Sequence, residues 1–140
     1  MRIFDLFDME EAIEVMDIGA SVITEVPVYR VLLDKRMARL TAFDGDARQI
    51  DKIENTYGKD FVTVLNYFIF DGGKHDVYLC SSASGMSSLF KPKVEALSFF
   101  NGFTKFGEVQ NIENIQTTKL DEIEEVKSPK ACNTLAELNH

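Results

Sequence analysis

The sequence contains no tryptophan, only three prolines and only two cysteines, and it has far fewer basic than acidic residues. The two cysteines, Cys80 and Cys132, are too widely separated for a disulfide framework or a zinc knuckle. The 15 lysines and arginines stand against 23 aspartates and glutamates, which gives a formal net charge of −8. Nonspecific nucleic-acid binding requires a concentrated positive field, so we expect no nucleic-acid partner.

Long apolar runs are also missing. No stretch approaches the ~18 apolar residues that cross a bilayer, and residues 1–14 mix Phe and Leu with acidic side chains, unlike a signal peptide. We therefore expect a soluble, cytoplasmic protein with no membrane partner. The 45% hydrophobic content suits a globular core, and the length suits one domain. We place this domain at residues 1–128 and expect an irregular tail at 129–140, because Pro129 breaks the chain.

The first half alternates strand and helix signals. Strands are expected at residues 14–20, 39–44 and 61–70. A helix beginning at Pro27 should turn Val28, Val31 and Leu32 toward a sheet. A second helix should run from Asp46 to about Tyr57 and stop at Gly58, with Asp46 and Gln49 at a capping-box spacing. This order predicts an α/β fold with a Rossmann-like parallel sheet and flanking helices.

The second half predicts a different arrangement. Asp71-Gly-Gly73 indicates a turn from which a strand at 75–80 returns, adding an extra β-hairpin. The serine-rich segment 81–88 predicts a loop, and the phenylalanines between 99 and 106 are assigned to the core. Another strand is expected within 109–118, followed by a helical turn at 120–126. The acidic residues 121–125 show no metal-ligand spacing, so no metal site is expected.

The first candidate site follows the first strand, at Asp17, Gly19, Ala20 and Ser21. Ligands of parallel sheets bind outside the carboxyl ends of the strands, where this turn is expected. A glycine lets the backbone approach a ligand closely. The G-x-G-x-x-G fingerprint and the Walker loop are both absent, so a plain connecting turn is the equally weighted alternative.

The second candidate site is Asp44-Gly-Asp46, after the second strand. Asp44 stands 25 residues beyond Gly19, close to the ~20 expected between a glycine turn and a ribose-binding acid. Asp44 is the better ribose candidate, because Asp46 is placed to cap the next helix. The two sites together favour a nucleoside-like ligand.

Three further residues carry weaker signals. Asp71 could reach an adenine amino group, but turn initiation explains it equally well. His75 has no catalytic partner at a telling distance and is expected to be an exposed residue at a strand end. Cys80 is expected to be a buried small hydrophobe.

Five blocks of sequence, in this order, suggest a family. They are Glu14-Val-Met-Asp-Ile-Gly-Ala-Ser21, Thr41-Ala-Phe-Asp-Gly-Asp46, Leu65-Asn-Tyr-Phe-Ile-Phe-Asp-Gly-Gly73, Ser84-Gly-Met-Ser-Ser-Leu89 and Gln116-Thr-Thr-Lys-Leu-Asp-Glu-Ile123. Their combination resembles the FkbM-type S-adenosylmethionine-dependent methyltransferases, which belong to the class I, Rossmann-like methyltransferases. The resemblance implies an incomplete class I methyltransferase fold, because the family's later strands have no counterpart after residue 128.

The resemblance also implies ligands and roles. Asp17, Gly19, Ala20 and Ser21 would line the methionine end of S-adenosylmethionine, Asp44 would bind the ribose and Asp71 would approach the adenine. The activity would be O-methylation of a small hydroxylated acceptor, and no catalytic base can be named. The alternatives are a non-catalytic nucleoside-binding module and a structural remnant of such a domain. An uncovered edge of the first strand predicts a homodimer or higher oligomer.

Overall fold

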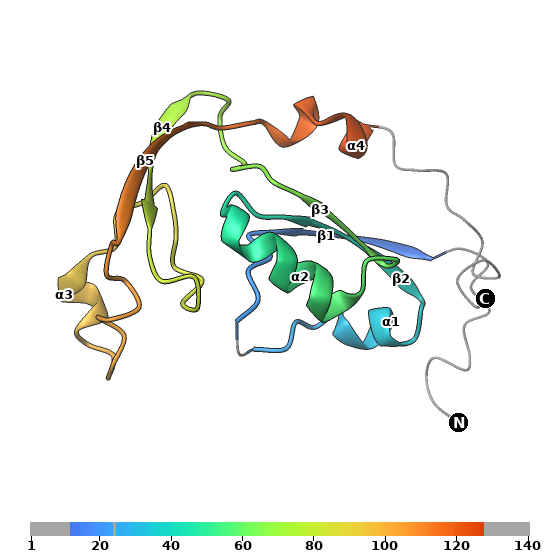
Figure 1. Cartoon of the computed structure of the whole chain (residues 1–140), viewed down its shortest axis with the longest axis horizontal. Helices are drawn as coiled ribbons and strands as arrows, with labels where there is room; N and C mark the ends of the chain where they lie inside the picture. The colour runs from blue at the N-terminus through green and yellow to red at the C-terminus, as the bar shows by residue number, and fades with distance from the viewer. Residues whose placement is uncertain (1–11, 24, 128–140) are drawn as a thin grey trace.

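The computed structural model describes residues 12–23 and 25–127 of the 140-residue chain, so the expected tail lies outside the described residues. Its main unit is a parallel sheet of three strands in the order β1-β2-β3 (Figure 1). These strands are β1 (Ile13–Ile18), β2 (Ala38–Phe43) and β3 (Val62–Leu65). The α/β class and the parallel sheet predicted from the sequence are confirmed, and the arrangement is compatible with a Rossmann-like fold.

Two helices pack against one face of this sheet. They are α1 (Arg30–Asp34) and α2 (Ile50–Tyr57), the latter preceded by the short 3₁₀ helix η2 (Ala47–Gln49). Leu33 of α1 and Ile53 of α2 join Leu40 and Ala42 of β2 in one buried cluster. Side chains alternate between the faces of a strand, so Leu40 and Ala42 point the same way and both helices cover that face. Gly58 ends α2 with a φ of 86°, as predicted.

The predicted contacts of the first helix are correct for Leu32 and wrong for the two valines. Helix α1 begins at Arg30 rather than Pro27, so Val28 is 95% exposed and Val31 is 44% exposed. Leu33 is the buried residue of this helix, and Leu32 packs half-buried against the same cluster.

Strand β1 lies at the edge of the described sheet, next to β2 alone. Its residues Met16 and Ile18 are 47% and 54% exposed. Within the described residues, β1 therefore has one unpaired edge, as predicted from the sequence.

The remaining strands form a separate antiparallel pair, β4 (Lys74–Leu79) with β5 (Asn111–Gln116). The predicted strand at 61–70 ends at Leu65, where the Asn66 amide donates to the carbonyl oxygens of Asp44 and Gly45 and turns the chain. The predicted hairpin is therefore wrong in its partner, since β4 pairs with β5 rather than with β3.

Short helices complete the second half, namely α3 (Val94–Leu97), η3 (Leu120–Glu122) and α4 (Glu124–Lys127). The expected helical turn at 120–126 is confirmed. The phenylalanines assigned to the core are not buried, since Phe99 is 86% and Phe100 is 61% exposed. Their segment around α3 lies at the end of the molecule farthest from the three-stranded sheet, so it has little to pack against (Figure 1).

Candidate functional site

The turn that follows β1 is held against the end of β2. The backbone N–H groups of Gly19 and Ala20 both donate to the carbonyl oxygen of Phe43, at 2.8 and 3.1 Å. Gly19 has a φ of 79°, a conformation that favours glycine, and a Cβ there would meet no atom within 4 Å. Open space therefore borders the backbone of this turn, as a ligand would require.

Asp44 lies directly after β2 and is only 6% exposed. Its Oδ2 accepts a hydrogen bond from the Ser21 hydroxyl at 2.7 Å, and its Oδ1 accepts one from the backbone N–H of Asp46 at 2.9 Å. Burial raises the pKa of the Asp44 carboxyl, and the two hydrogen bonds offset part of that effect. Each carboxylate oxygen keeps a further acceptor site, so the group can still receive hydroxyl donors.

A cavity of about 250 Å³ opens at this pair. Gly19, Ser21 and Asp44 line it, and the aromatic residues that follow β3 supply an aromatic wall. Those aromatic residues are Tyr67, Phe68 and Phe70, joined by Phe90 from the loop after β4. The cavity thus combines a carboxylate with flat apolar surfaces.

The other residues predicted for the first site face a different cavity. Asp17 and Ala20 line a space of about 670 Å³ beside α1, which shares Gly19 and Ser21 with the first cavity. The hydroxyl of Tyr29 donates to Asp17 Oδ2, and burial together with this contact raises the pKa of the tyrosine. The 19–21 turn therefore separates two cavities.

Asp71 lines neither of these cavities. Its Oδ1 accepts a hydrogen bond from the backbone N–H of Gly73 at 2.8 Å. The same oxygen lies 2.8 Å from Nε2 of His75. The Gly73 N–H, followed by the His75 contact, lowers the pKa of the Asp71 carboxyl. These contacts match the turn-initiating interpretation of Asp71. His75 stands at the start of β4 with a one-third exposed side chain.

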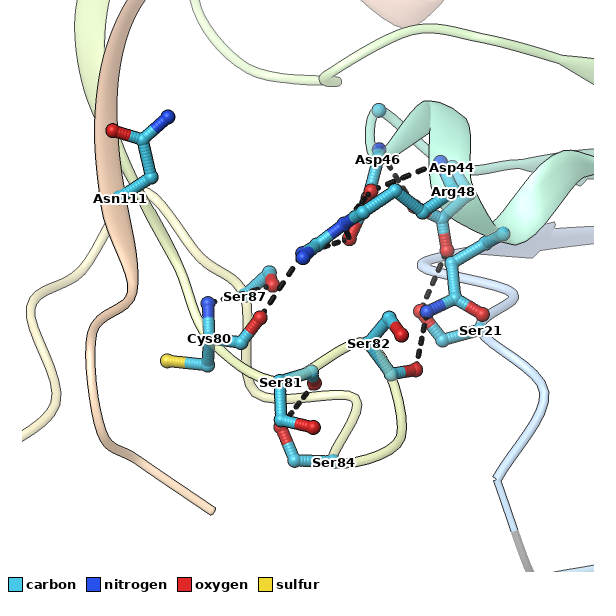
Figure 2. A network of polar contacts seen from close by, with 12 residues as sticks. Ser21, Asp44, Asp46, Arg48, Cys80, Ser81, Ser82, Ser84, Ser87 and Asn111 are labelled. Carbon is cyan, nitrogen blue, oxygen red and sulfur yellow. Dashed lines mark hydrogen bonds and ion pairs between the residues drawn. The ribbon is translucent and has the colours of Figure 1, made fainter. Parts of the chain in front are cut away.

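A polar bridge that the sequence did not reveal joins η2 and the start of α2 to the loop after β4 (Figure 2). The Arg48 guanidinium donates to both carboxylate oxygens of Asp46 and, at 3.0 Å, to the carbonyl oxygen of Cys80. Burial raises the pKa of Asp46, but the hydrogen bonds from Arg48 outweigh this effect and hold that pKa below its ordinary value. The sequence signal for this ion pair was an arginine two residues after an aspartate predicted to cap a helix.

Gln49 forms the second part of this bridge. Its Nε2 donates to the carbonyl oxygen of Ser82 at 2.6 Å, and Lys52 Nζ donates to the Ser82 hydroxyl at 3.2 Å. The predicted capping box is therefore half correct: Asp46 accepts from the N–H of Arg48, but the Gln49 side chain bonds to the loop instead of returning to Asp46. The bridge fixes the loop that carries part of the 250 Å³ cavity.

The comparisons identify no relative. No protein-family model, curated protein or solved structure matches this chain. Within residues 12–23 and 25–127, no group of three His, Cys, Asp or Glu side chains could hold a metal ion. No helix in these ranges is long and apolar enough to cross a membrane.

Proposed function

We propose that this chain binds the nucleoside part of S-adenosylmethionine and forms the cofactor-binding portion of a class I methyltransferase fold of the FkbM type. The observation that carries the proposal is the buried Asp44 carboxylate, paired with Ser21 and facing a cavity beside Gly19. It stands at the carboxyl ends of two neighbouring parallel strands, the usual ligand position in such sheets. The family resemblance supplies the name of the cofactor.

The residues present fit a nucleoside. Asp44 can accept hydrogen bonds from two ribose hydroxyls, and the neighbouring Ser21 hydroxyl can rotate to accept one of them. The aromatic wall formed by Tyr67, Phe68 and Phe70 offers flat surfaces for a base. The volume of about 250 Å³ lies slightly below the ~300 Å³ of the smallest ordinary ligand pockets, so binding of a whole cofactor would extend past Gly19 into the neighbouring cavity.

S-Adenosylmethionine supplies an electrophilic methyl group, and we propose a small hydroxylated molecule as its acceptor. The contribution of this chain is to bind and orient the cofactor, and an oriented methyl donor already removes much of the entropic barrier to transfer. No described side chain is assigned as the base.

Titration calorimetry with S-adenosylhomocysteine tests the proposal. Asp44→Asn removes the charge from the ribose contact, and a hydrogen bond to a charged group contributes about 1.5–3 kcal/mol. We therefore expect affinity to fall roughly tenfold to a hundredfold. Asp51→Asn is the matched control, because Asp51 is an exposed residue of α2 that lines none of these cavities. Equal affinities for the two variants, or no binding by the folded wild type, would overturn the proposal.

A second candidate function, a non-catalytic module that oligomerises through its sheet edge, is favoured by β1. Backbone hydrogen bonds alternate along a strand, and the N–H groups of Ile13 and Gly19 point toward β2. The N–H of Met16 therefore points outward, beside a side chain that is 47% exposed. Light scattering after size exclusion should find a dimer or larger species, and Met16→Lys should shift it to monomer. A wild-type monomer at micromolar concentration would contradict this alternative.

A further inference from the structure

A third cavity, of about 480 Å³, lies on the face of the sheet that α1 and α2 do not cover. Glu14 and Met16 of β1 stand opposite Arg39 and Thr41 of β2 in the strand register, and all four line it. The cavity shares no lining residue with the two cavities that meet at Gly19. It is therefore a separate candidate site.

Arg39 is the unusual residue of this cavity. The side chain is half-buried, yet within the described chain it makes no hydrogen bond or ion pair, and its Nε is fully buried without a partner. Arg30 and Arg48, by contrast, are paired with Asp34 and Asp46. A partly buried charged group without a hydrogen-bond or ion-pair partner is costly. Arg39 therefore provides a position for an anionic group.

The other lining residues limit which kind of anion this cavity could bind. Glu14, Asp60 and Glu125 are exposed carboxylates at the cavity, and none of them belongs to an ion pair among the described residues. Two further charged residues of the lining are already paired, Lys59 with Glu54 and Glu124 with Lys127. The three unpaired carboxylates would repel a multiply charged anion such as phosphate and attract an ammonium group. Phe61 and Met16 add apolar surface. The matching ligand carries one carboxylate, one ammonium and an apolar body.

We propose that this cavity binds a free α-amino acid with an apolar side chain, its carboxylate at Arg39 and its ammonium toward the acidic rim. The proposal is independent of the methyltransferase assignment, because the two sites share no residue.

L-Leucine is the probe, titrated into the full chain by calorimetry. Leucinamide lacks the carboxylate and N-acetyl-L-leucine lacks the ammonium, so each should bind at least tenfold more weakly than leucine. Inorganic phosphate should not compete. Absence of leucine binding by the folded wild type, or equal binding of leucine and both derivatives, would overturn the proposal.

Variants locate the binding. Arg39→Met keeps the aliphatic length but removes the charge, and should weaken leucine at least tenfold while leaving S-adenosylhomocysteine binding unchanged. Lys74→Met is the matched control, since it removes a positive charge from β4, which does not line this cavity. Asp60→Asn provides a surface variant that needs no change in the sheet, and it should weaken leucine but not N-acetyl-L-leucine. Unchanged leucine affinity in folded Arg39→Met or in Asp60→Asn would refute the assigned contacts.

Discussion

Replacing Arg48 by methionine should destabilise the protein in a way that depends on pH. The Arg48 side chain is 41% exposed, whereas its partner Asp46 is 6% exposed. Loss of the guanidinium would leave a buried carboxylate with only the backbone N–H of residue 48 as a donor to its Oδ1. Methionine preserves most of the apolar length of arginine, so the change tests mainly the charged contacts.

The size of the effect follows from those contacts. Arg48 Nε lies 2.8 Å from Asp46 Oδ1, and the terminal nitrogen that contacts Oδ2 also donates to the carbonyl of Cys80. Hydrogen bonds to a charged group contribute about 1.5–3 kcal/mol. Because Arg48 is substantially exposed, solvent screening reduces this, and we expect a loss of about 1–2 kcal/mol in the free energy of unfolding at pH 7.

The pH dependence has a definite sign. The pKa of Asp46 is lower in the folded state than in the unfolded chain, so the pair stabilises the fold above the unfolded pKa, about 3.9. This contribution disappears as the pH falls through the lower folded pKa. Urea denaturation of wild type and Arg48→Met should therefore differ at pH 7 and converge at the acidic end of the range in which both fold.

The double mutant with Asp46→Asn provides the control. Coupling of about 1 kcal/mol between Arg48→Met and Asp46→Asn is expected at pH 7, with little coupling in acid. Additive effects, or an equal loss for Arg48→Met at every pH, would refute the role of the charged pair and assign the effect to packing or to the Cys80 carbonyl.

Three further predictions concern the same region. Asp44→Asn should raise the free energy of unfolding at pH 7 by about 0.5–2 kcal/mol in urea denaturation, since burial raises the folded pKa of Asp44 and its charge costs stability above the unfolded value; a loss would contradict this. Gly45→Ala should cost about 1–3 kcal/mol in the same assay, because a Cβ would lie 2.2 Å from the Phe68 ring; an unchanged midpoint would count against that contact. In a Cys132→Ser background, Cys80 should react slowly with a thiol reagent until urea is added, because burial raises its pKa; rapid labelling of the native chain would show otherwise.

The parts of the fold that the sequence predicted are those set by local patterns. Strand β2 and helix α2 follow apolar periodicity and end at recognisable signals such as Gly58. The strand expected at 61–70 was too long, because the Asn66 side chain satisfies backbone carbonyls of a neighbouring segment that is distant in sequence. The pairing of β4 with β5 likewise depends on tertiary packing and has no local signature.

The candidate site shows the same division. Gly19 and Asp44 could be predicted because each follows a strand and their separation is close to that between a glycine turn and a ribose-binding acid. Ser21 contacts Asp44 because the ends of neighbouring parallel strands lie side by side. The aromatic wall was missed because its residues were assigned to a strand. Arg39 was missed because the sequence does not show whether an arginine within a strand will find a hydrogen-bond partner in the folded protein.

The bridge between α2 and the loop after β4 has a consequence for how this chain tolerates substitution. Its donors are the side chains of Arg48, Gln49 and Lys52, but the acceptors at Cys80 and Ser82 include main-chain carbonyls. Every amino acid carries that carbonyl, so the loop could change its side chains while the attachment remained. Sequence drift should therefore be permitted on one side of the bridge and restricted on the other, and a saturation mutagenesis profile would record this asymmetry.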